Sequence, residues 1–256
     1  MTDRSFRQRV RRHTGDLLLG LTGGVASVAD TFPVFADQIR VWRPDQNVTL
    51  SGSPAVDEGN VDSWEDTENG VSLLQGTSGN QPKLETAGSQ PALKTDASDD
   101  FMYVAETPVS SGPWTIAGLF NITSTTLNQD ALFGLGTTDA GYVFVAPNAG
   151  VVRLFSKNLT GGTGTTSITL GLHLVEISYD GSNMNVYLDG VYEASLSSSP
   201  GFTLTVGVNL FCSRNGSNVD QNGYHCHFLV VCDDEWTSGE RAQGLADTET
   251  WIGESL

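Results

Sequence analysis

The fold of this chain is decided by a stretch that reads HLVEISYDGSNMNVYLDGVYEASL, from His173 to Leu196. Tight-turn sequences interrupt it at 180–183 and at Asp189-Gly190. Between the turns, apolar residues recur at every second position, which places them on one face of each strand. They are Val175, Ile177 and Tyr179 before the first turn and Met184, Val186 and Leu188 after it. The stretch therefore predicts an antiparallel meander of three strands.

Similar short runs recur along the chain about 8 to 12 residues apart or slightly more, which is typical of a β-sandwich. The clearest are 39–42, 114–122, 131–135, 142–145 and 151–155. Residues 202–210 alternate apolar and polar side chains, which predicts a strand with one buried face. Toward the end of residues 224–232, the side chains are apolar at successive positions and so on both faces of the strand, which predicts a strand between two layers.

The remaining segments are predicted to be connections, apart from one helix. Residues 43–70 form a polar stretch, and 160–166 are interpreted as a Gly/Thr loop. Residues 238–251 predict a helix, with Ser238 as its cap and Gly253 behind it.

Composition excludes several classes of protein. The chain has 256 residues, of which 38% are hydrophobic, so it can bury a core. Asp and Glu number 30 against 13 Lys and Arg, and the net charge of −17 argues against a general nucleic-acid-binding surface. No apolar run reaches the roughly 18 to 20 residues of a membrane span, so we expect no membrane partner. The three cysteines, Cys212, Cys226 and Cys232, allow one disulfide at most.

Four segments together resemble the concanavalin A-like lectin/glucanase superfamily, in particular its laminin-G-like modules. Asp62–Gly70 reads DSWEDTENG, similar to an early W-x-D-x-x-x-x-G segment, and Leu74-Gln75 follows it. The other three are 81–102, the hairpin at 173–190 and the closing strand with its helix at 228–241. The resemblance implies an all-β, antiparallel jelly-roll sandwich over residues 38–256 with a short C-terminal helix. The version with the early Trp-Asp segment resembles modules of tailed-phage structural proteins.

Residues 1–37 are interpreted as an extended N-terminal docking arm. Basic side chains precede an apolar run there, and such a terminus becomes ordered by contact with a partner. We expect the partners to be other virion proteins and further copies of the chain, as in a trimer. The predicted docking residues are Arg4, Arg7, Arg9, Arg11, Arg12, Leu17, Leu18, Leu19 and Leu21. The alternative is a secretory signal cleaved after Ala29.

A glycan hydrolase is the least favoured function. A retaining mechanism needs two carboxylates roughly 5 to 5.5 Å apart, and the superfamily supplies them in the pattern E-x-D-x-x-E. Here Glu176 is followed by Ser178, and Asp180 lies about 13 Å further along an extended strand. We therefore expect that the protein is not an enzyme and that Glu176 is a solvent-facing strand residue.

Surface aromatic residues are the favoured binding material, because sugars stack on flat rings. The candidate glycan-binding residues near predicted strand ends are Trp64, Tyr142, Tyr192 and Trp236.

No cofactor is expected, and calcium is the alternative. Its candidate ligands are Asp99, Asp100, Asp233 and Asp234, although the last two are better explained by a solvated turn. The sequence His225-Cys226-His227 with Cys232 invites a zinc site. Strand alternation would direct the two histidines away from both cysteines, so no zinc site is predicted.

Three functions follow from these observations. The leading hypothesis is a non-enzymatic phage virion protein, a capsid decoration, head fibre or tail component located in the particle, that displays a lectin-like domain to host-surface glycans. The second is a secreted, extracellular carbohydrate-binding or adhesion module of a bacterium. The third is a glycan hydrolase.

Overall fold

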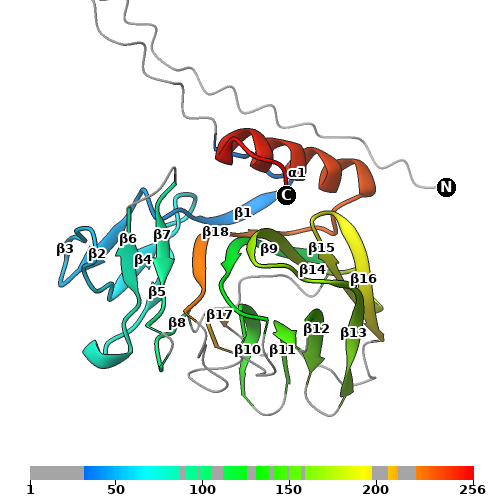
Figure 1. The fold of residues 1–256 in the computed structure, drawn as a ribbon, viewed down its shortest axis with the longest axis horizontal. Coiled ribbons are helices and arrows are strands. Elements are labelled where there is room, and N and C mark those ends of the chain that lie inside the picture. The colour runs from blue at the N-terminus through cyan, green and yellow to red at the C-terminus, as the bar shows by residue number, and fades with distance from the viewer. Residues whose placement is uncertain are drawn as a thin grey trace, which may run out of the picture. The chain divides into compact units, whose positions relative to one another are not determined.

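Two antiparallel β-sheets and one helix make up the part of the chain that the computed structural model describes (Figure 1). The predicted docking residues of the arm, Arg4 to Leu21, lie outside that part. The described residues are 32–86, 90–96, 98–104, 112–125, 131–138, 141–148, 150–156, 159–197, 207–212 and 223–256.

The first sheet contains the predicted meander and follows the order β16-β15-β14-β9-β18-β7-β6, with β1 pairing with β18. Asp189 and Gly190, at the second turn of the meander, have φ of 49° and 76°. Positive φ at both central residues suits the twist of a tight hairpin, so the Asp-Gly turn is confirmed. The strands are β1 (Gln38–Trp42), β6 (Lys83–Glu85), β7 (Ala92–Lys94), β9 (Trp114–Ile122), β14 (Gly171–Tyr179), β15 (Asn183–Leu188), β16 (Val191–Ser197) and β18 (His225–Cys232).

The second sheet follows the order β13-β12-β11-β10-β17-β8-β5-β4-β2-β3. Its strands are β2 (Val48–Leu50), β3 (Ser53–Pro54), β4 (Ser63–Glu65), β5 (Ser72–Leu74), β8 (Met102–Val104), β10 (Phe133–Thr138), β11 (Gly141–Asn148), β12 (Val151–Ser156), β13 (Leu159–Ser167) and β17 (Val208–Leu210). A 3-10 turn, η1 (Ser78–Asn80), precedes β6.

Two of the sequence expectations for this sheet were wrong. The Gly/Thr segment interpreted as a loop is strand β13, because pairing with β12 satisfies a backbone whose side chains give no apolar alternation. The polar stretch up to Gly70 contains β2, β3 and β4: β2 and β3 form a tight hairpin, and β4 pairs with β2. Of the strand predicted at 202–210, the structure describes 207–210, with β17 at its end.

Two apolar clusters lie on opposite faces of the first sheet, and β18 contributes to both. Cys226, Leu229 and Val231 belong to the core between the sheets. Phe228 and Cys232 belong to a second cluster on the outer face, which includes helix residues. The prediction that this strand lies between two layers is therefore confirmed. Phe32 and Phe35, from the segment assigned to the arm, also pack in the second cluster.

Helix α1 (Ser238–Ile252) is predicted correctly in extent, but its cap is Thr237 and not Ser238. The Thr237 hydroxyl accepts from the Glu240 amide at 3.3 Å, and the Glu240 carboxylate accepts from the Thr237 amide at 2.8 Å. This capping box fixes the start of the helix, and Gly253 ends it with φ of 78°. Among the described residues, no helix combines the length and apolar character needed to cross a membrane.

Candidate functional site

The outer face of β14, β15 and β16 carries polar and aromatic side chains beside helix α1. The alternate residues of these strands, such as Ile177 and Val186, belong to the core. Their neighbours therefore point away from it. Register places Glu176 opposite Tyr187, and Tyr187 opposite Tyr192. We call these three residues, together with Arg241 of α1, the tyrosine face.

Glu176 anchors the tyrosine face through a bidentate ion pair. Arg241 donates to its carboxylate from Nε at 2.8 Å and from Nη2 at 2.7 Å, and Nη2 also donates to the Trp236 carbonyl. Glu176 is 2% exposed and Arg241 is 6% exposed. Burial raises the pKa of Glu176 to about 6, although the hydrogen bond and charge of Arg241 act in the opposite direction.

The expectation that Glu176 faces solvent was wrong. The strand pattern correctly placed its side chain on the face opposite the core, but it could not show that α1 covers this part of the face. Both carboxylate oxygens are occupied by Arg241, so Glu176 is not available to attack or protonate a substrate.

Arg241 also fixes the aromatic residues of the face. Its guanidinium carbon lies 3.5 Å from the ring centroid of Tyr187, a cation–π contact. The Tyr187 ring meets Tyr192 at a centroid distance of 5.7 Å and an interplanar angle of 74°. Tyr192 is 53% exposed, so its ring contacts Tyr187 on one side and is open to solvent on the other. A flat, fixed and exposed ring of this kind is suited to stacking with the C–H face of a sugar.

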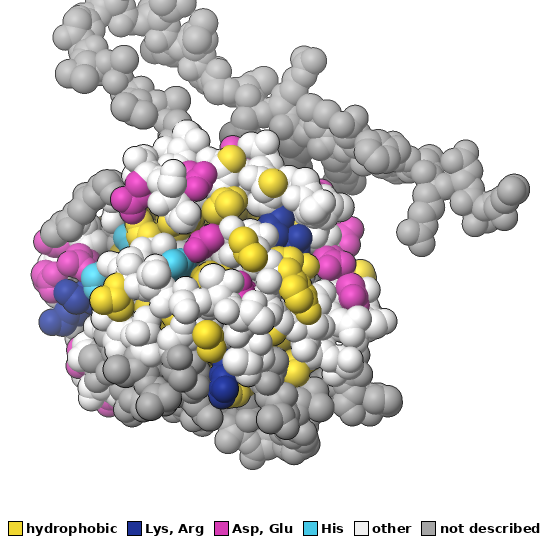
Figure 2. Space-filling model, turned by 45° about the vertical axis from the view of Figure 1, so that its right-hand side comes forward, with side chains coloured by type: hydrophobic (Ala, Val, Ile, Leu, Met, Phe, Trp, Pro, Cys, Tyr) yellow, Lys and Arg dark blue, Asp and Glu magenta, His cyan; other side chains and the backbone are white. Residues whose placement is uncertain are grey.

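Polar groups border the tyrosine face. Glu235 is partly exposed. Its pKa is raised, mainly by burial and by the charge of Asp180, and the opposing charge of Arg241 and hydrogen bond from Asn185 do not cancel this shift. Asp180 shapes the β14–β15 turn by accepting from the amides of Ser182 and Asn183. The face drawn in Figure 2 has acidic side chains at several points and fewer basic ones, in keeping with the net charge of −17.

Two of the other predicted glycan-binding aromatics, Trp64 and Trp236, are buried and do not join Tyr192. Trp64 is 0% exposed, and its Nε1–H donates to the Arg43 carbonyl inside the core. Trp236 is 3% exposed and stacks on Phe35 with ring centroids 5.2 Å apart. Both predictions were wrong because Trp64 packs in the core between the sheets and Trp236 packs in the second apolar cluster. The side chain of Tyr142 lies outside the described residues.

The acidic candidates for calcium are only partly brought together. Asp99 and Asp100 join Asp96, and ligand atoms of the three lie within 4.8 Å of one another. Asp100 is buried and accepts from the Asp96 amide at 2.7 Å, so part of this cluster is a turn motif. Carboxylate oxygens suit Ca²⁺, and the sequence argument missed Asp96. Asp233 and Asp234 are exposed beside the start of α1, where Asp234 accepts from the Glu235 amide.

The prediction that Cys226 and Cys232 face the same way was wrong. A bulge between Cys226 and Phe228 shifts the pattern of β18, so Cys226 points into the core while Cys232 lies on the outer face. All three cysteines are buried, and none of them forms a disulfide. His225 pairs instead with Glu85, at 3.3 Å between Nδ1 and Oε2. Burial, reinforced by the charge of His225, lowers the pKa of His227 to about 4.

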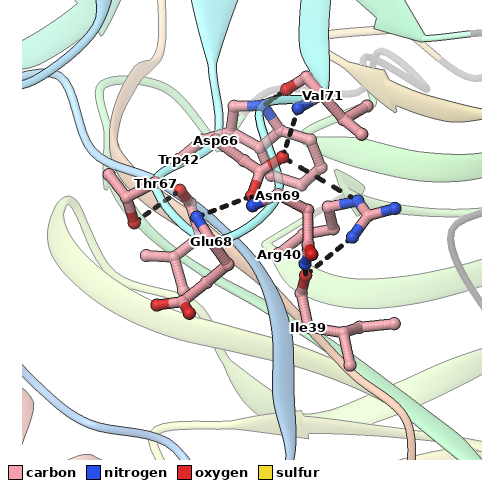
Figure 3. Close-up of polar contacts among 9 residues, drawn as sticks. Ile39, Arg40, Trp42, Asp66, Thr67, Glu68, Asn69 and Val71 are labelled. Atoms are coloured by element: carbon pink, nitrogen blue, oxygen red, sulfur yellow. Dashed lines mark hydrogen bonds and ion pairs between the residues drawn. The ribbon is translucent and has the colours of Figure 1, made fainter.

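The segment 62–70 that carries the family resemblance is a structural element (Figure 3). Asp66 accepts from three backbone amides, those of Glu68, Asn69 and Val71, at 2.6 to 2.9 Å. Trp42 donates from Nε1 to the Val71 carbonyl, which ties the turn to β1. The buried carboxylate is thus satisfied by the backbone that it shapes.

Comparisons with known proteins place the fold. No family model matches the chain, and no curated protein does. Trypanosoma rangeli sialidase in complex with sialic acid matches with a TM-score of 0.64 at 14% identity, over 86% of this chain and 34% of the sialidase. The ligand-binding domain of botulinum neurotoxin serotype D, in complex with N-acetylneuraminic acid, matches with a TM-score of 0.62 at 12% identity, over 86% of this chain and 54% of that chain.

The receptor-binding domain of botulinum neurotoxin type G matches with a TM-score of 0.58 at 10% identity, over 83% of this chain and 52% of that chain. The chain thus spans about a third of the sialidase and about half of each toxin chain. These likenesses show an antiparallel β-sandwich, as the sequence predicted.

Proposed function

We propose that the β-sandwich is a glycan-binding domain and that Tyr192 is the platform on which a sugar ring stacks. The observation that carries the proposal is the exposed Tyr192 ring held against Tyr187, which Arg241 holds in turn. A ring fixed before binding loses little conformational freedom on binding, which favours affinity. Asn185 and Glu235 lie nearby with groups able to bond sugar hydroxyls.

The fold comparisons support the same proposal from a second direction. A sialidase and a neurotoxin domain that share this sandwich were each solved with a bound sialic acid. At 12 to 14% identity they share the fold with this chain, and no ligand is carried over from them.

The experiment is a screen of the full chain on a glycan array, followed by titration of the best ligand. Tyr192→Ala should weaken binding at least tenfold. Tyr103→Ala is the matched control, since Tyr103 lies on the other sheet and stacks on Phe101 at 6.3 Å. An unchanged affinity in Tyr192→Ala, or an equal loss in both variants, would remove the tyrosine face from the proposal.

We propose further that the domain binds glycans without hydrolysing them. The carboxylate singled out by the sequence, Glu176, is locked by Arg241 and shielded from solvent. Release of reducing sugar from the glycan that binds best, abolished by a carboxylate substitution, would overturn this part of the proposal.

The role in a phage virion is a separate proposal that rests on the basic and apolar arm. Leu17→Asp with Leu19→Asp in the full chain should prevent incorporation into particles at any salt concentration, because buried apolar anchors dominate docking. Replacing the five arginines should slow association in a salt-dependent way. Normal incorporation of the leucine variant would overturn the virion role. A mature chain starting at Asp30 would favour the secreted alternative.

A further inference from the structure

We infer that the tyrosine face selects uncharged glycans and discriminates against sialylated and other anionic ones. The inference deepens the proposed function and rests on it. It concerns ligand class, on which this chain departs from the two fold neighbours that were solved with an acidic sugar.

The cation of the tyrosine face, Arg241, is already paired with a carboxylate of this chain. Recognition of a carboxylate on a sugar calls for an Arg or Lys with free donors, and a bidentate arginine serves best. Arg241 belongs to the tyrosine face, and its Nε and Nη2 already donate to Glu176 and the Trp236 carbonyl. One face of its guanidinium lies over Tyr187, and the residue is almost fully buried. Its charge is neutralised, and its donors point inward.

The other Lys and Arg that the structure describes lie on or next to other strands. Among the residues that the structure describes, no other Lys or Arg belongs to β14, β15, β16 or α1. Arg153 belongs to β12 between Val152 and Leu154, which point into the core, so alternation directs it away from the sandwich interior. The other described Lys and Arg lie on or next to β1, β6 and β7 and are Arg40, Arg43, Lys83 and Lys94; Lys157, Arg214 and the arginines of the arm lie outside the described residues.

Acidic groups border the tyrosine face. Glu235 lies close enough to Arg241, Asp180 and Asp234 for their charges to act on its carboxylate. With Arg241 paired to Glu176, the groups left over are negative. A second carboxylate brought in by a ligand would therefore meet like charge, whereas hydroxyls could bond to Asn185 or Glu235.

The test uses the full chain on an array printed in matched pairs, each glycan with and without its terminal sialic acid. Binding should favour the uncharged member at least tenfold in low salt, and the ratio should narrow in high salt because the repulsion is screened. Glu235→Gln should narrow the ratio as well. Glu65→Gln is its control, an exposed glutamate on the other sheet that should leave the ratio unchanged.

The outcomes separate the two proposals. Equal or tighter binding of the sialylated members, lost in Tyr192→Ala, would overturn the inference and leave the proposed function standing. Binding to no glycan on the array would overturn both.

Discussion

The outer face of the first sheet has two halves of opposite character. One half is covered by α1 and by Phe32 and Phe35, which together with β18 form the second apolar cluster. The other half, over β15 and β16, leaves Tyr192 open to solvent. The Glu176–Arg241 ion pair lies where the two halves meet. Through it, helix α1 contacts the strand residue Glu176 and the ring of Tyr187. One sheet face thus carries both a buried apolar cluster and the exposed ring that we propose binds glycans.

The largest effect is expected in the covered half. Phe228 is buried against Phe32, Phe35 and Trp251. Phe228→Ala should lower the free energy of unfolding by about 3 to 5 kcal/mol, through lost burial and the cavity left behind. Urea unfolding followed by circular dichroism measures it. A loss below 1 kcal/mol would mean that the helix and the residues before β1 contribute little to folding.

The ion pair at the border should come next. Glu176→Gln leaves the charge of Arg241 buried without its partner, and the cost should be about 3 kcal/mol. The matched control is Glu235→Gln, which changes a partly exposed carboxylate and should stay within about 0.5 kcal/mol. An equal loss of unfolding free energy in the two variants would contradict the distinction between the border and the open half of the sheet face.

The open half should tolerate truncation. Tyr192→Ala removes a ring that is half exposed and one edge contact with Tyr187, so the loss in stability should be about 1 kcal/mol or less. The same variant should lose glycan binding, which separates a binding role from a folding role. Thermal unfolding and titration on one sample compare the two. A loss of several kcal/mol would assign the ring to the core instead.

The smallest effect concerns pH at the end of β14. Burial lowers the pKa of His173, but the hydrogen bond and charge of Asp189, 2.7 Å away, outweigh it and leave the pKa raised. The stability from this pair is therefore fully present below the unfolded pKa of about 6.5 and is lost as pH rises through the folded pKa.

Urea midpoints between pH 5 and pH 9 would measure this contribution. Asp189→Asn keeps a residue that tolerates the positive φ of the turn and should flatten this part of the pH profile. An identical profile in the wild type and the variant would show that the pair does not stabilise the fold.

Sequence alone determined the features that depend on neighbouring positions. The meander, the Asp-Gly turn, the two-sided strand β18 and the C-terminal helix all follow from periods of two or 3.6 residues and from turn and cap chemistry. Such signals lie within a few residues of one another, so they can be read without knowing which strands pair. Tyr192, at a strand edge, is the one candidate glycan-binding residue for which the structure describes an exposed ring.

Tertiary structure decided everything that depends on partners far along the chain. Glu176 and Arg241 are 65 residues apart, and no local pattern shows that a helix will cover that strand position. Trp64 and Trp236 are buried by distant elements, and the bulge in β18 that parts Cys226 from Cys232 arises from its pairing with β9. Alternation tells which way a side chain points, whereas long-range packing decides whether water, a helix or a ligand meets it.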